Sequence, residues 1–257
     1  MLITKIEKLK DNKYKIIVDG EKITTFDNVI LDNNLLYKKN IDINLYNKII
    51  EETKYYDIYN KTIKYILKRR RSEKEIREYL IKQELEHDKI EETILKLKNI
   101  NLINDLEYCK AYINDCVYLS KKGINKIKSD LLSQDISIHV IENILQNIDV
   151  NIFNNRLEKA ILKKINSNKK YSNFQLKQKI LNEMMNLGYE KEKILNILDN
   201  NLIDNSIIAK KEFDKLYNKL SKKYSGEELF KNIKTKLLTK GFNLGEINKF
   251  IQEKTEE

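Results

Sequence analysis

Proline is absent from this chain of 257 residues, and glycine occurs only six times. Strand sandwiches and barrels need a tight turn about every ten residues, and glycine and proline provide most of those turns. Their scarcity excludes an all-β fold, and the absence of proline also excludes a proline-rich disordered chain. Hydrophobic residues make up 41% of the sequence and charged residues 34%. High charge with regular apolar spacing indicates thin helical layers with much exposed surface.

Residues that commonly bind metals are few, with two cysteines and two histidines. On a helix, Cys109 and Cys116 would lie two turns, about 10 Å, apart, which is too far for a disulfide. We expect both to be small buried residues in a reducing cytoplasm. His87 and His139 stand at metal-ligand spacing from neither cysteine, so we expect both on the surface and predict no metal site.

Signals of catalysis are also missing. The sequence has neither a GxxxxGK nor a GxGxxG phosphate-binding loop, so it predicts no cofactor. Acidic residues occur throughout, and no pair of them stands out as general acid and base. Tyr55, Tyr56, Tyr59 and Tyr65 could stack on bases, but tyrosine in a helical array without tryptophan more often fills a core. The sequence therefore does not predict an enzyme.

No apolar run approaches the roughly 18 residues of a membrane span, and the N-terminus lacks a signal-peptide core. We expect a cytoplasmic protein with no membrane contact. Lysine and arginine outnumber aspartate and glutamate by 49 to 39, which gives a net charge of +10. An excess of positive charge favours a polyanionic partner such as DNA.

The first fifty residues differ from the rest. Residues 3–9 and 14–18 read as strands, Asp19-Gly20 is a hairpin signal, and residues 21–26 supply a returning strand. Asp42 then caps a helix, and the apolar period stays helical from there on. We predict a β-rich head over residues 1–52.

The helical part contains an internal repeat. Five apolar positions recur four times with internal steps of 4, 5, 5 and 4, and successive repeats are offset by 51, 53 and 53 residues. The steps of 4 keep residues on one helical face, and the central steps mark a turn between two helices. The recurring residues are Ile76, Leu80, Leu85, Ile90, Ile94; Ile127, Leu131, Ile136, Ile141, Leu145; Ile180, Met184, Tyr189, Ile194, Leu198; and Ile233, Leu237, Phe242, Ile247, Ile251.

Signals at helix ends agree with this repeat. Capping boxes begin at Ser72, Ser172 and Ser225, each opening the helix that carries the first recurring position. Gly188 and Gly241 stand where that helix should end in a left-handed residue. The matching positions of the first two repeats are Glu84 and Asp135, and the conformation of those two turns is left open.

A further helix precedes each pair, at about residues 55–69, 106–119, 157–165 and 207–222. We therefore predict a mainly α fold of four tandem three-helix repeats in an elongated, curved array. The predicted domains are residues 53–104, 105–149, 150–203 and 204–257, which follow the β-rich head.

Basic residues gather where the first and second helices of two repeats meet. Stacked repeats place equivalent junctions on one side, so we predict one continuous, solvated basic strip that binds DNA or an acidic groove. A solvated face without a binding role is the alternative interpretation. The candidate binding residues are Arg69, Arg70, Arg71, Lys74, Arg77, Lys121, Lys122, Lys126 and Lys128.

Residues 69–80, with the sequence RRRSEKEIREYL, resemble the R-P-R-S-E-x-E-[LV]-R-x-x-L signature of the RecX family, bacterial modulators of the RecA recombinase. Residues 102–109 and 120–131 are similar to two further motifs of that family, [YL]-I-[ND]-D-x-x-[FY]-A and K-x-K-G-x-x-x-I-x-x-x-L. The head resembles that of long members over residues 3–7 and 18–21. The resemblance covers essentially the whole chain.

Four positions depart from the family pattern. Arg70 and Ile124 stand where the family usually has proline, and Asn101 stands where it usually has glycine. Cys116 occupies a position that is often basic. Loss of the prolines changes the stiffness of loops more than their chemistry.

The resemblance implies a non-enzymatic regulator. RecX proteins bind in the groove of the RecA filament on single-stranded DNA, block its extension or promote its disassembly, and so reduce ATP hydrolysis and strand exchange. Some also bind DNA directly. We therefore expect a monomer whose partners are the RecA filament and, with weak and salt-sensitive affinity, DNA. The alternatives are a general helical-repeat DNA-binding or scaffold protein without a RecA role, and a helical-repeat DNA repair enzyme.

Overall fold

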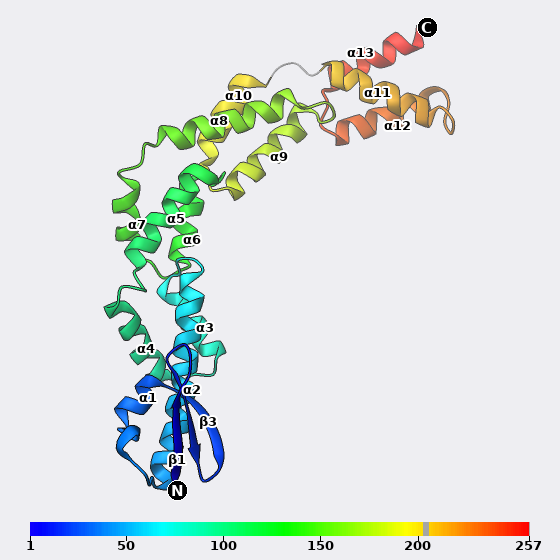
Figure 1. The fold of residues 1–257 in the computed structure, drawn as a ribbon. Coiled ribbons are helices and arrows are strands. Elements are labelled where there is room, and N and C mark those ends of the chain that lie inside the picture. Colours follow the sequence, from blue (N-terminus) through cyan, green and yellow to red (C-terminus); the bar gives the residue numbers. More distant parts are fainter. Residues whose placement is uncertain (203–205, 257) are drawn as a thin grey trace. The chain divides into compact units, whose positions relative to one another are not determined.

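The computed structural model describes residues 1–202 and 206–256 (Figure 1). Within these residues the chain has 13 α-helices and one three-stranded sheet near the N-terminus. The mainly helical class predicted from the sequence is therefore confirmed. The chain divides into two compact units, Met1–Tyr108 and Cys109–Glu257.

The first unit begins with an antiparallel sheet whose strands follow in the order β1 (Ile3–Lys8), β2 (Lys13–Val18) and β3 (Glu21–Phe26). The turn between β2 and β3 has φ values of +47° at Asp19 and +88° at Gly20. Two left-handed central residues form the tight hairpin turn that an Asp-Gly pair favours. The predicted β-rich start is confirmed.

The core of the head lies between this sheet and α1 (Asp27–Asp32), the 3-10 helix η1 (Leu35–Tyr37) and the start of α2 (Ile43–Leu67). Ile16 and Val18 of β2 are fully buried, because alternate side chains of a strand point to the same face. The other buried residues of this core are Val29, Ile30, Leu35, Ile41 and Ile49.

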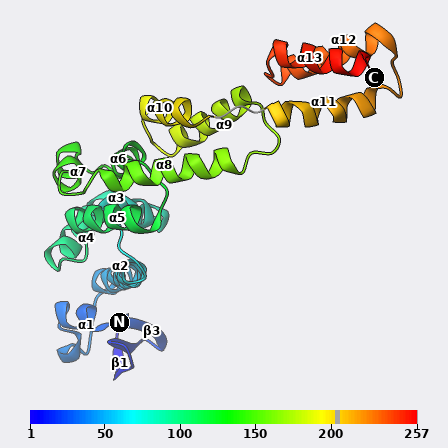
Figure 2. The same cartoon turned by 90° about the horizontal axis from the view of Figure 1, so that it is seen from above.

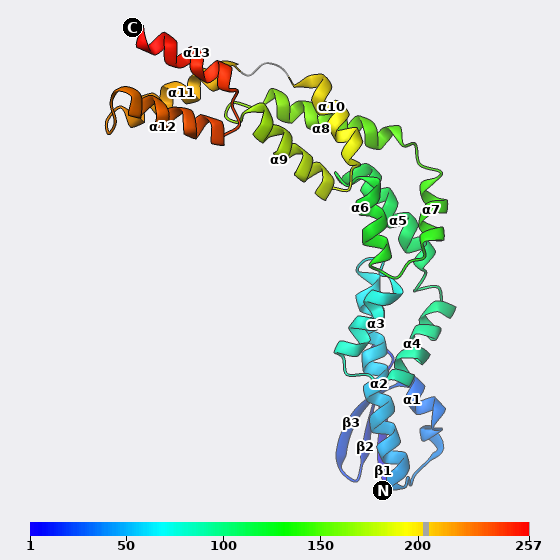
Figure 3. The same cartoon turned by 180° about the vertical axis from the view of Figure 1, so that it is seen from behind.

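Helix α2 is a single helix of 25 residues that runs past the sheet (Figures 1 and 3). Asp42 caps it as predicted, since its carboxylate accepts a hydrogen bond from the Leu45 amide at 2.7 Å. Ile49 belongs to the core of the head, and Ile66 belongs to the next core. The predicted boundary between residues 52 and 53 lies inside α2, because no proline or glycine interrupts the helix between the two cores.

The rest of the first unit packs the end of α2 against α3 (Glu73–Lys82) and α4 (His87–Asn99). Both short helices are strongly amphipathic, so each presents one apolar face to this core. The buried residues of the core are Ile66, Ile76, Leu80, Ile90, Ile94, Leu97 and Ile103.

Helix α5 (Asp105–Leu119) crosses the division between the two units, and eight helices follow it. Separate cores form within α8–α10 and within α11–α13, whose three helices pack together (Figure 2). The predicted boundary at 203/204 lies outside the described residues. The eight helices are α6 (Ile124–Leu132), α7 (Ile138–Leu145), α8 (Asn151–Asn166), α9 (Asn173–Asn186), α10 (Lys191–Asn201), α11 (Ser206–Leu220), α12 (Gly226–Thr239) and α13 (Leu244–Thr255).

The recurring apolar positions of the sequence are covered in the fold. Sixteen of the twenty are buried, and the other four, Leu85, Leu145, Tyr189 and Ile251, are half-buried. In each set of three helices the second helix carries the first two positions, and the third helix carries the last two. The period read from the sequence is therefore the period of the buried surface.

The turn between the second and third helix has the same backbone geometry in all four sets. The residue before the central apolar position has a left-handed φ in each: +58° at Glu84, +61° at Asp135, +84° at Gly188 and +75° at Gly241. The amide after it donates to a carbonyl five residues back, for example Tyr189 to Met184 at 3.1 Å. The two turns left open by the sequence thus adopt this helix-ending motif without glycine.

The three predicted capping boxes differ. Ser72 forms the complete box with Glu75. Ser172 caps α9 by accepting from the Gln175 amide at 3.2 Å, and its hydroxyl donates to the carbonyl of Lys240 at 2.5 Å. Ser225 makes no side-chain cap bond, and that prediction is wrong. The residue after it, Gly226, has a φ of +57°, so α12 begins with a left-handed residue rather than with the geometry of a box.

Within the second unit, the loop before α6 packs directly on the turn before α10. The Gly123 amide donates to the Leu187 carbonyl at 2.6 Å. A Cβ atom on Gly123 would lie 2.6 Å from the carbonyl oxygen of Gly188, and one on Gly188 would lie 2.2 Å from the Lys126 nitrogen. Only glycine fits on either side of this joint.

A second joint of the same kind connects the start of α9 with the turn between α12 and α13. The bond from Ser172 at the start of α9 reaches Lys240, next to the left-handed Gly241. A Cβ atom on Gly241 would lie 2.8 Å from the ring of Phe174. In both joints the start of a second helix contacts the turn of the following set.

Cys109 and Cys116 are buried and free, as predicted, and His87 and His139 are exposed. Tyr55 is buried in an aromatic cluster with its neighbours on α2. Among residues 1–202 and 206–256, no helix combines the length and apolar character that a membrane crossing requires.

Candidate functional site

The nine candidate residues fall into two clusters, one in each unit. The first occupies the junction of α2 and α3, and the second the junction of α5 and α6. The continuous strip predicted from the sequence would join the two units, and it stays a prediction. Each cluster is built from its own contacts.

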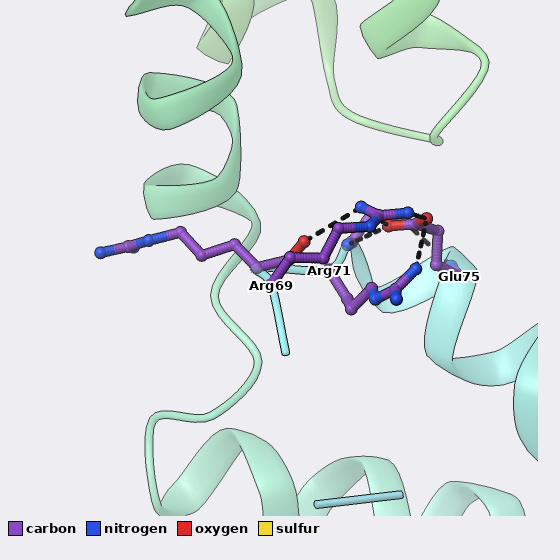
Figure 4. Close-up of polar contacts among 5 residues, drawn as sticks. Arg69, Arg71 and Glu75 are labelled. Carbon is purple, nitrogen blue, oxygen red and sulfur yellow. Dashed lines mark hydrogen bonds and ion pairs between the residues drawn. The ribbon is translucent and has the colours of Figure 1, made fainter. Parts of the chain in front are cut away.

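Glu75 organises the first cluster. Its carboxylate accepts from Arg69 Nη2 at 2.5 Å and from Arg71 Nη1 at 3.4 Å, and both arginines converge on it in Figure 4. The same carboxylate completes the capping box by accepting from the Ser72 amide at 3.3 Å. Two of the candidate cations are thus fixed to the first turn of α3.

Arg71 packs against the protein with most of its side chain covered. Its guanidinium lies 3.8 Å from the centroid of the Tyr65 ring, and Tyr65 stacks on Tyr79 with ring centroids 4.3 Å apart. Its side chain is only 12% exposed. The expectation that the whole cluster is solvated is therefore wrong for Arg71, because stacking on an aromatic ring and pairing with Glu75 cover the side chain.

Arg77 ties α3 to α4. Its Nε donates to Glu73 at 2.8 Å, and its Nη1 and Nη2 each donate to one carboxylate oxygen of Glu91, which forms a bidentate pair. The hydrogen bond with Glu91 is the largest cause of a raised pKa for this guanidinium. Lys98 Nζ also forms an ion pair with Glu73, at 2.5 Å from its Oε2. These contacts give Arg77 a structural role within the unit.

Arg70 differs from its neighbours. Its side chain is 63% exposed, and its Nη1 makes only a long ion pair, 3.7 Å, with the carboxylate of Glu107. All three consecutive arginines line a concavity of about 490 Å³ together with Asn101, Asn104 and Tyr108. The exposed Arg70 at this opening is the member of the cluster most available to an anionic partner. Lys74 is half-buried on the first turn of α3.

Asp130 organises the second cluster. Its carboxylate accepts from Lys122 and Lys126, both at 2.8 Å, and from the Tyr112 hydroxyl at 2.6 Å. Burial opposes ionisation of Asp130, but these three hydrogen bonds outweigh it and lower its pKa to about 2. Burial and the bond to Asp130 raise the pKa of Tyr112. The charges of Lys122 and Lys126 are therefore partly neutralised by Asp130.

Of the two remaining lysines of this cluster, one is paired with a carboxylate and the other is exposed. Lys128 pairs with Glu142 of α7 at 2.8 Å. Lys121 is exposed, and in the part of the chain that the structure describes its ammonium pairs with no carboxylate. Its carbonyl accepts from the Tyr189 hydroxyl at 3.1 Å, which fixes the backbone at this point. Lys121 is thus the counterpart of Arg70.

Arg156 is a structural cation that the sequence did not predict. From α8 it donates to the carbonyls of Cys116 at 3.2 Å and Lys122 at 3.3 Å, and also to that of Val117. A cation on the last carbonyls of α5 stabilises that end of the helix. The one available signal was its residue type, since Arg156 is the only arginine after Arg77 in a lysine-rich chain.

No family model matches the chain. It is 30% identical to the regulatory protein RecX of Listeria welshimeri over 98% of this chain and 97% of that protein. The chain belongs to the RecX family. A RecX from Clostridium perfringens is 32% identical over 73% of this chain and 90% of its own length. These relatives are described as regulatory proteins, which agrees with the expectation that this chain is not an enzyme.

The fold agrees with this assignment. A crystal structure of a regulatory protein RecX superposes with a TM-score of 0.64, covering 77% of this chain and 98% of the other at 21% identity. The match shows the RecX fold for most of the chain.

Proposed function

We propose that this protein regulates a RecA recombinase by binding the RecA filament on single-stranded DNA, where it inhibits filament extension, ATP hydrolysis and strand exchange. The observation that carries the proposal is the match over 98% of the chain to proteins described as regulatory protein RecX. The family signature at residues 69–80 supports it, because its three arginines, Arg69, Arg70 and Arg71, line the concavity.

The proposed binding surface is smaller than the set of nine candidate residues. Arg70 and Lys121 are exposed at equivalent junctions, whereas Arg71 is covered and Lys122 and Lys126 pair with Asp130. We assign attraction of the filament mainly to Arg70 and Lys121. The other candidate cations that pair with carboxylates hold the junctions in shape.

The proposal includes the repeat architecture. Four three-helix repeats behind a β-rich head would present four equivalent junctions, and the recurring turns and the two joints of the second unit support this division. Repeats that contact mainly their neighbours form extended surfaces of the kind that bind long partners.

The test is the ATPase activity of RecA on single-stranded DNA, measured with increasing amounts of this protein. Inhibition at less than one molecule per RecA supports filament regulation. An unchanged rate up to equimolar protein would leave a general DNA-binding or scaffold role as the better account.

A further inference from the structure

A basic loop that belongs to neither candidate cluster lies at the junction of α8 and α9. Residues 169–172 read Lys-Lys-Tyr-Ser, and the same four residues recur at 222–225, 53 positions later. This junction is equivalent to those that carry Arg70 and Lys121. The exposed Lys170 therefore continues the same series of cations.

The loop is held in shape by its own side chains. Asn168 Oδ1 accepts from the amides of Lys170 at 3.2 Å and Tyr171 at 2.9 Å, and its Nδ2 donates to the Tyr171 carbonyl at 2.8 Å. Ser172 then caps α9. A loop that is already ordered loses little conformational entropy when it binds a ligand.

The loop borders a concavity of about 420 Å³. Tyr171 lines it and is packed on one side against the core of α8–α10, so its ring is held in place. Four lysines and one glutamate contribute the charges of the lining: Lys164, Lys169, Lys170, Lys179 and Glu183.

Most of this positive charge is available. Lys164 Nζ forms an ion pair with Glu183 Oε2 at 2.7 Å. Lys179 Nζ instead lies 4.1 Å from the centroid of the Tyr171 ring. Among the described residues, Lys169, Lys170 and Lys179 pair with no carboxylate. The α5–α6 junction differs in this respect. There Asp130, which occupies the position of Glu183 in the repeat, pairs with two lysines and neutralises more of the positive charge.

We propose that this loop is a binding site for single-stranded DNA, in which Lys169, Lys170 and Lys179 contact phosphates. As Lys179 Nζ moves from the ring of Tyr171 to a phosphate, a base takes its place and stacks on that ring. Lysines beside a fixed aromatic ring are the pattern by which proteins bind single strands without sequence preference. The inference deepens the proposed function, because it assigns contact with the DNA strand of the filament to the α8–α9 junction.

The first test measures binding to a fluorescent oligo-dT strand by anisotropy without RecA, so that its outcome is independent of RecA inhibition. Changing Lys169, Lys170 and Lys179 to Ala should reduce the slope of log affinity against log salt concentration by about 2, since each phosphate contact on a single strand contributes about 0.7. The control changes Lys22, Lys38 and Lys39 to Ala, which removes the same charge from exposed residues of the head, away from all helix junctions. An equal loss in both variants, or no binding by the parent, would overturn the proposal.

The second test concerns the ring. Tyr171→Phe keeps the stacking surface and should bind within about twofold of the parent. Tyr171→Leu keeps an apolar side chain on the core and should bind roughly tenfold more weakly, since stacking on one base is worth about 1–3 kcal/mol. Thermal unfolding of both variants checks the fold. Equal affinities for the two variants would contradict a stacking role.

Discussion

Two adjacent arginines at the α2–α3 junction have opposite environments. Arg71 stacks on Tyr65 and is 12% exposed, whereas Arg70 is 63% exposed. Arg71→Ala should lower the free energy of unfolding by about 1–3 kcal/mol, because it removes a covered cation–π contact and a bond to Glu75. Arg70→Ala should change it by less than about 0.5 kcal/mol. Urea unfolding of the two variants makes the comparison, and equal losses would contradict the assignment of a structural role to Arg71 alone.

Glu84 is an exposed residue at a left-handed φ of +58°. Glu84→Gly should raise the free energy of unfolding by about 1 kcal/mol, because glycine adopts this conformation without the clash that costs an L residue roughly 1–2 kcal/mol. Gln83→Gly is the control. Gln83 has a φ of −89°, so the same change there should destabilise. Thermal unfolding measures both, and a loss in Glu84→Gly would refute strain at this turn.

Asp130 predicts a dependence of stability on pH. Its pKa in the folded protein is about 2, below the ordinary value of 3.8. A lowered pKa means that the ionised group stabilises the fold above pH 4 and that this stabilisation disappears as pH falls toward 2. At pH 7 Asp130→Asn should lose on the order of 2 kcal/mol of unfolding free energy. The difference between parent and variant should shrink in urea titrations at falling pH; a constant difference would exclude this cause.

Much of the residue-level detail was readable from sequence, and the rest depended on partners far along the chain. The recurring apolar residues were predicted because burial follows helical periodicity. The covered state of Arg71 was not, since its contact with Tyr65 depends on how α2 ends and α3 begins. Asn101 was identified from the sequence only as a departure from the family motif. Its φ of +60° explains why glycine is usual at that position.

At the scale of elements, the joint between the loop before α6 and the turn before α10 depends on close contact of two backbones. Gly188→Ala should cost more than about 2 kcal/mol, because it adds a clash with Lys126 to the strain of a φ of +84°. Gly20→Ala is the matched control: its φ is +88°, but no atom lies within 4 Å of the added Cβ. It should cost only about 1 kcal/mol. Equal losses in thermal unfolding would mean that the joint is not tightly packed.

The division of the last helices into separate cores predicts the outcome of truncation. A chain that ends at residue 202 keeps the core of α8–α10 complete and should still unfold cooperatively. A chain that ends at residue 225 keeps α11 but uncovers Phe213, which is fully buried in the intact protein, and should aggregate. Calorimetry and light scattering compare the two. Loss of cooperative unfolding in the shorter chain would contradict independent cores.

At the scale of the whole molecule, the central claim is that this RecX-family protein acts on the RecA filament through its exposed junction cations. The most direct measurement is a titration of RecA ATPase on single-stranded DNA with three proteins: the parent, Arg70→Glu/Lys121→Glu, and Lys22→Glu/Lys39→Glu. The last variant makes the same change of charge on exposed lysines of the head. We expect the parent and the head variant to inhibit at less than one molecule per RecA, and the junction variant to need at least roughly tenfold more protein, since each charge contact with the filament is lost and reversed. Equal inhibition by all three folded proteins would contradict the assigned surface, and no inhibition by the parent would contradict the function itself.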